Sequence, residues 1–146
     1  MANEVTVVLS LNIRKDALQE NPQPTSYQFD MSGTVGPTPG VVTVPTTGAA
    51  VDLAELTTPG PCWLVNLDPT NYVEYGIRDP GANIFYPLGE LQPWDSAGGK
   101  PQYVYLSRNL LEEYTGTGTG TTPPGNQLWL KANKASCKVV VKAFDR

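Results

Sequence analysis

Short segments of alternating apolar and polar residues, separated by glycine and proline, are the feature that most constrains this chain. In residues 4–14, every second residue from Val5 to Ile13 is apolar, so one side of an extended strand would be apolar and the other polar. Comparable segments recur at intervals of roughly ten residues, the spacing typical of a β-sandwich. They lie at residues 27–31, 41–44, 62–67, 72–75, 84–88, 103–106, 128–130 and 137–143.

The turn residues between these segments indicate the fold class. The 146 residues include 14 Gly and 14 Pro, and each of them shortens the element that it interrupts. We therefore predict an all-β, antiparallel, jelly-roll-like β-sandwich of about eight to ten short strands with at most two short helices. The length suits a single domain over residues 1–146.

A few segments are compatible with short helical turns. Residues 16–19 favour one helical turn, and residues 107–114 favour one or two. Residues 52–56 leave two alternatives open: a single helical turn with Asp52 at its N-cap and Glu55 three residues later, or a strand that ends in a loop.

Residues 61–78 form an apolar run, a polar break and a second apolar run, which predicts two antiparallel strands meeting at a loop. We expect Asp68, Thr70 and Asn71 to form the turn, because Asx side chains bond to the backbone two residues on. Their oxygens also suggest calcium, but the segment lacks the length and charge of a dedicated calcium loop. A last hairpin is predicted with its turn near Asn133.

The sequence offers little for catalysis. It contains no His and two Cys, which excludes His-dependent triads and His-ligated zinc. The glycine run from Gly116 does not match a dinucleotide fingerprint, because its sixth position is Thr121. Carboxylates that converge would suit glycoside hydrolysis, but acidic residues beside turns are usually solvated. The candidates are Glu74, Asp79, Glu90 and Asp95. We expect no enzyme activity, no catalytic residue, no metal and no cofactor.

Charge and hydropathy limit the partners and the compartment. The net charge of −4 provides no basic field for nucleic acid. No apolar run approaches the roughly 20 residues that cross a bilayer, and the N-terminus lacks the form of a signal peptide. We expect synthesis in a cytoplasm, with Cys62 and Cys137 as buried thiols.

Two loops are the candidate interaction loops. One contains Trp94, which either covers the core edge or meets a partner. The other is the low-complexity segment 116–125, predicted to be mobile; its glycines are Gly116, Gly118, Gly120 and Gly125. A glycan platform is an alternative. Its aromatic residues would be Tyr72, Tyr75, Tyr86, Trp94 and Tyr103.

Residues 58–77, TPGPCWLVNLDPTNYVEYGI, resemble a recurring pattern in small virion structural proteins of tailed bacteriophages. The matching positions are Pro59, Gly60, Asn66, Leu67, Asp68, Thr70, Asn71, Tyr72, Val73 and Gly76, followed by Leu88, Leu91 and Pro93. The C-terminal segment resembles the closing hairpin of such proteins around Leu128, Ala132, Asn133 and Cys137. The pattern departs at Trp94 and Asp95, where such proteins carry Gly-Glu, and at an added loop through Gln102.

This resemblance implies a non-enzymatic β-sandwich or jelly-roll subunit at the capsid surface of a virion. The implied function is that of a capsid decoration, or cement, protein that binds the major capsid protein and itself as a dimer or trimer. A tail, collar or fibre-associated module is the alternative within the virion, and a glycan-binding β-sandwich is the alternative from another class.

Overall fold

The computed structural model describes residues 4–10, 12–31, 35–56, 59–79, 83–94, 103–106 and 128–145. Within these ranges the chain is all-β and antiparallel, as predicted, with twelve strands where about eight to ten were expected. No helix among these residues is long and apolar enough to cross a membrane. The backbone divides into two compact units, Met1–Ser32 and Gly33–Arg146. The single-domain organisation stays a prediction.

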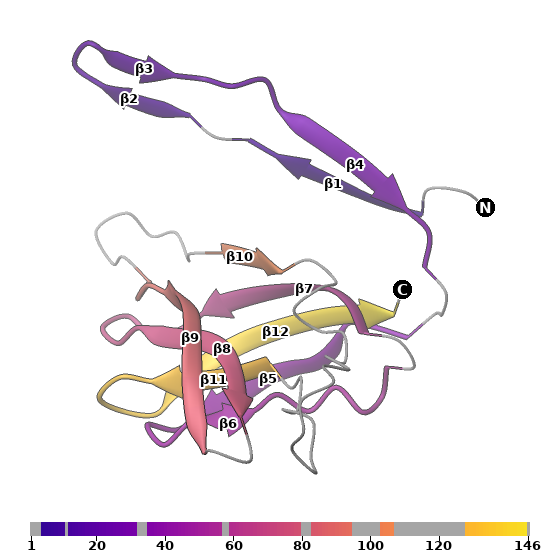
Figure 1. Cartoon of the computed structure of the whole chain (residues 1–146), viewed down its shortest axis with the longest axis vertical. Helices are drawn as coiled ribbons and strands as arrows, with labels where there is room; N and C mark the ends of the chain where they lie inside the picture. The colour runs from indigo at the N-terminus through magenta and orange to yellow at the C-terminus, as the bar shows by residue number, and fades with distance from the viewer. Residues whose placement is uncertain are drawn as a thin grey trace. The chain divides into compact units, whose positions relative to one another are not determined.

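The first unit is a two-stranded ribbon, which we call the N-terminal ribbon (Figure 1). In it β1 (Val5–Leu9) pairs with β4 (Thr25–Phe29), and β2 (Ile13–Lys15) pairs with β3 (Leu18–Glu20). The expected single strand over residues 4–14 is therefore two strands. The helical turn expected at residues 16–19 is wrong, because this segment closes the β2–β3 hairpin with Asp16 at φ 51°.

The described residues of the second unit form eight strands. They are β5 (Thr38–Val44), β6 (Ala49–Ala50), β7 (Pro59–Asn66), β8 (Val73–Asp79), β9 (Ile84–Leu91), β10 (Tyr103–Leu106), β11 (Leu128–Ala132) and β12 (Cys137–Asp145). The first strand pairs with the last, the second with the last but one, and so on to the middle of the unit. The pairs are β5 with β12, β6 with β11, β7 with β10, and β8 with β9. These are the nested pairs of one long antiparallel ribbon.

Two further ladders, β12–β7 and β11–β8, roll that ribbon into two four-stranded sheets. Their strand orders are β10-β7-β12-β5 and β6-β11-β8-β9. Successive strands change sheet at every connection except β8–β9. This connectivity is that of a jelly roll and confirms the predicted architecture.

The predicted hairpin over residues 61–78 is wrong in its pairing. Strand β7 lies in one sheet and β8 in the other, so the segment between them is a corner joining the two layers. The predicted hairpin around Asn133 is likewise a corner between β11 and β12. A hairpin and an inter-sheet corner have the same local pattern of apolar run, turn and apolar run. Only the distant partner strands distinguish them.

Residues 52–56 form a turn rather than a helix. The backbone N–H of Ala54 donates to Asp52 Oδ1 at 3.0 Å, and that of Leu56 donates to the Leu53 carbonyl at 3.0 Å. Glu55 accepts a hydrogen bond from Thr38 Oγ1 at 2.7 Å. The alternative of a strand ending in a loop is therefore correct, while the helical segment predicted at residues 107–114 lies outside the described residues.

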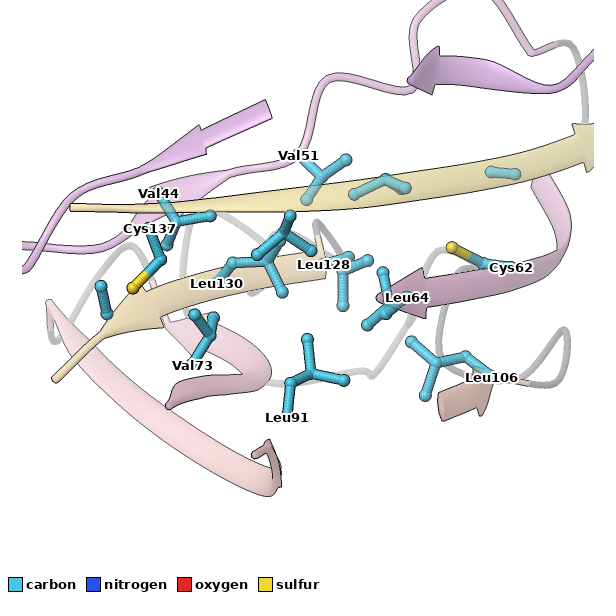
Figure 2. Close-up of a cluster of buried hydrophobic side chains, with 14 of the residues drawn as sticks. Val44, Val51, Cys62, Leu64, Val73, Leu91, Leu106, Leu128, Leu130 and Cys137 are labelled. Carbon is cyan, nitrogen blue, oxygen red and sulfur yellow. The ribbon is translucent and has the colours of Figure 1, made fainter. Parts of the chain in front are cut away.

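The core lies between the two sheets of the second unit. Along β12, every second residue from Cys137 to Ala143 is buried. Figure 2 shows Leu64 of one sheet and Val73, Leu91, Leu128 and Leu130 of the other pointing into the same layer. Cys62 and Cys137 are buried free thiols at opposite ends of this cluster (Figure 2).

Candidate interaction surface

The predicted turn residues meet at the corner between β7 and β8. Asp68 Oδ1 accepts hydrogen bonds from the backbone N–H groups of Thr70 at 2.9 Å and Asn71 at 2.7 Å. It also accepts from Thr70 Oγ1 at 3.2 Å and from Asn71 Nδ2 at 3.1 Å. Desolvation raises the pKa of Asp68, but these donors outweigh it and lower the pKa overall. Four donors thus converge on one of the two carboxylate oxygens, as expected for a residue that forms the turn.

Asn66, expected only as a position of the resemblance to phage proteins, anchors this corner. Its side chain is fully buried at the end of β7. Its Nδ2 lies 2.8, 3.1 and 3.2 Å from the carbonyl oxygens of Asn71, Leu91 and Gln92, so two hydrogens serve three acceptors. Its Oδ1 accepts from the Asp68 N–H at 2.9 Å. One amide therefore ties the corner to the end of β9.

Trp94 lies at this same end of the sandwich. Its backbone N–H donates to the Asp68 carbonyl at 2.8 Å, and its side chain is 39% exposed. The corner after β11 joins the group, because the Asn133 N–H donates to the Tyr72 carbonyl at 3.3 Å. In Figure 1 the β7–β8 and β11–β12 connections lie at one end of the sheets. Trp94 is thus held beside the predicted turn with part of its ring open to solvent.

The remaining predicted interaction residues are the four glycines of segment 116–125. Gly116, Gly118, Gly120 and Gly125 lie outside the described residues. The aromatic glycan platform is wrong in the form expected, because Tyr75 packs against the core. Tyr86 lies on β9 of one sheet and Tyr103 on β10 of the other.

A different aromatic surface covers the outer side of the β10-β7-β12-β5 sheet. Cys62 and Leu64 of β7 face the core, so the alternate residue Trp63 faces outward and is 44% exposed. Its ring lies edge-on to those of Tyr103 at 6.2 Å and Tyr105 at 6.4 Å between centroids. Tyr103 is 59% exposed.

Strand register extends this surface across the sheet. Val65 lies between Tyr103 and Val140, and Val140 lies opposite Val41, which is 60% exposed. Lys142 is the partner of Trp63 on β12. We call this surface the Trp63 face, and it comprises Val41, Trp63, Tyr103, Tyr105, Val140 and Lys142.

The alternation along β7 was a signal that Trp63 faces outward, because its neighbour Cys62 was expected to be buried. Tyr103 was expected in a glycan platform with Tyr72, Tyr75, Tyr86 and Trp94, and not as a neighbour of Trp63. Its position beside Trp63 depends on the pairing of strands that are about 40 residues apart in sequence. The outward position of Trp63 could therefore be predicted from the sequence, whereas the composition of the Trp63 face could not.

The described part of the chain contains no group of three His, Cys, Asp or Glu side chains that could hold a metal ion. Of the carboxylates considered for hydrolysis, Glu74 and Glu90 are cross-strand partners on β8 and β9. The side chain of Asp79 and the whole of Asp95 lie outside the described residues. No family model, curated protein or solved structure matches this chain.

Proposed function

We propose that this chain is a non-enzymatic structural subunit of a tailed-phage virion, a decoration or cement protein that binds the major capsid protein. In this proposal it is made in the host cytoplasm, associates as a dimer or trimer and stabilises the head at the capsid surface. The observation that supports the proposal best is the Trp63 face. The outer side of a sandwich sheet that meets only water is ordinarily polar, whereas this one carries exposed aromatic and aliphatic side chains.

The chemistry of the Trp63 face suits a protein partner. Trp and Tyr are the residues that most often dominate interface energetics, because a large apolar ring ends in a hydrogen-bonding group. Trp63 and Tyr103 offer such groups side by side on a rigid strand pair. The exposed Lys142 beside them would form part of a polar rim.

The N-terminal ribbon offers a second contact. Val8, Leu9, Ile13 and Leu18 are all exposed on its strands, each of which has one hydrogen-bonded neighbour. A two-stranded ribbon is marginally stable in water, so a ribbon of this kind gains order from a partner. A clamp of this kind, repeated over many copies, adds stability to a shell through multivalency.

Particles assembled with and without this chain test the cement role. Particles lacking it are expected to burst at a lower temperature. A Trp63→Ala/Tyr103→Ala double variant should bind decoration-free particles at least about tenfold more weakly. The matched control is Tyr86→Ala, which removes an exposed aromatic from the other sheet and should bind normally. Equal burst temperatures with and without the chain would remove the cement role.

A tail, collar or fibre-associated module is the alternative within the same particle. The number of copies per particle distinguishes the two, because a shell protein is present in hundreds of copies and a tail part in far fewer. Quantitative mass spectrometry of purified particles measures this number directly.

A further inference from the structure

The outer side of the second sheet, β6-β11-β8-β9, carries an open groove of about 420 Å³. The middle of this sheet lacks a side chain, because Gly76 lies between Trp129 and Pro87 in register. A Cβ at Gly76 would clash with the Tyr86 carbonyl oxygen, so glycine is required where β9 approaches. At the groove's edge, Gly48 has φ 79°, and a Cβ there would lie 3.3 Å from the Trp129 ring.

Arg78 is the most distinctive group in the groove. Its guanidinium carbon lies 4.3 Å from the centroid of the Trp129 ring, which fixes the planar group by a cation–π contact. Arg78 forms no ion pair with any residue that the structure describes. The N–H donors at the edge of the guanidinium therefore remain available for an anion, which they would bind as a fork.

Two of the three charged residues that line the groove are positive, while Glu90 lies outside the lining on the strand beside Glu74. Lys131 Nζ lies 3.9 Å from Glu74 Oε2 and 5.9 Å from the Phe85 ring, so its pairing with Glu74 is loose. Arg78 and Lys131 together outweigh the one lining carboxylate, although the whole chain carries a net charge of −4. A local positive site in an acidic protein favours a ligand with a negative group.

The remaining lining suits a sugar ring. Phe85 and Pro87 provide flat apolar surface, while Asn83 and Glu74 offer polar groups that hydroxyls can bond. The groove is open to solvent. We propose that this groove binds a saccharide that carries a carboxylate, with Arg78 on the carboxylate and Phe85 beside the ring. This site is independent of capsid binding through the Trp63 face.

The test compares methyl β-D-glucuronide with methyl β-D-glucoside, which differ in the carboxylate. Each sugar is titrated into the isotope-labelled chain to about 20 mM, which detects dissociation constants in the millimolar range. The glucuronide should shift the Trp129 indole N–H and Arg78 Nε signals saturably, and the glucoside should bind at least about tenfold more weakly.

Two variants test the residues. Arg78→Gln should weaken glucuronide binding at least about tenfold, and Lys131→Gln should weaken it less. Lys138→Gln removes a positive charge from the other sheet and should bind like the wild type. A dispersed NMR spectrum of each variant verifies its fold. No saturable shift with glucuronide, equal binding of the two sugars, or unchanged binding by folded Arg78→Gln would each overturn the proposal.

Discussion

The N-terminal ribbon and the jelly roll share the same alternation of apolar and polar residues, yet they bury different fractions of their apolar side chains. In β12 of the jelly roll, Val139 and Val141 are buried completely, because a second sheet covers that side. In the ribbon Val7 is buried, but Leu9 on the same strand face is 52% exposed. Alternation therefore determines which side chains share a face, and a covering layer determines whether that face becomes core.

The largest expected difference concerns thiol reactivity. Burial raises the pKa of Cys62 to about 12, and burial followed by the charge and hydrogen bond of Asp68 raises that of Cys137 to about 11. The thiolate fraction of Cys62 at neutral pH should be on the order of a thousandfold below that of an exposed thiol. A Val8→Cys variant, at a ribbon position that is 61% exposed, should label rapidly.

Mass spectrometry after timed alkylation counts the labelled thiols. We expect one rapid label in Val8→Cys and two further labels only after unfolding. Rapid labelling of the wild-type chain under native conditions would contradict the buried positions of both cysteines.

The next largest difference between the jelly roll and the ribbon should be the loss of stability when a leucine is truncated to alanine. Leu64→Ala leaves a cavity between the sheets and should lower the free energy of unfolding by about 2–5 kcal/mol. The matched change in the ribbon, Leu9→Ala, should cost no more than about 0.5 kcal/mol. Urea denaturation measures both. Similar losses would mean that a partner or layer covers the ribbon as fully as the core.

Side-chain hydrogen bonds provide a third comparison between the jelly roll and the N-terminal ribbon. Asn66→Ala leaves the buried carbonyl of Leu91 without its amide donor and should cost about 1–3 kcal/mol. In the ribbon, Gln28 Nε2 donates to Thr6 Oγ1 at 3.1 Å on an exposed face, so Gln28→Ala should change stability by less than about 0.5 kcal/mol. The same denaturation experiment decides whether the Asn66 network matters more than a solvent-exposed hydrogen bond.

The smallest effect should be a pH dependence of the protein's stability that arises from Asp68 at the β7–β8 corner. A carboxyl whose pKa is lowered by folding stabilises the protein above its unfolded pKa, about 3.9, and loses that contribution as the pH falls. Wild type should therefore be more stable than Asp68→Asn at pH 7, and the difference should shrink towards pH 3. A difference that grows on acidification would show that the pKa is raised.

Whether a contact at the β7–β8 corner could be predicted depends on how far apart the two bonded residues lie in the sequence. Asp68 bonds to Thr70 and Asn71, two and three residues away, so its role as a turn former was readable from the sequence. The Asn66 amide bonds to carbonyls 25 and 26 residues away, and no local pattern announces such partners. The same limit applies to Trp63 and Tyr103, which meet through strand pairing.

Local sequence specified the strand class and the turn at Asp68, because both depend on neighbouring residues. Tertiary structure decided that residues 61–78 join two sheets instead of forming a hairpin. The backbone N–H and C=O groups of a strand can pair with any other strand, so the local sequence does not specify which strand is the partner. Tertiary structure also decided which apolar faces are covered. Leu64 and Trp63 are adjacent in one strand, and the position of the second sheet makes one of them core and the other surface.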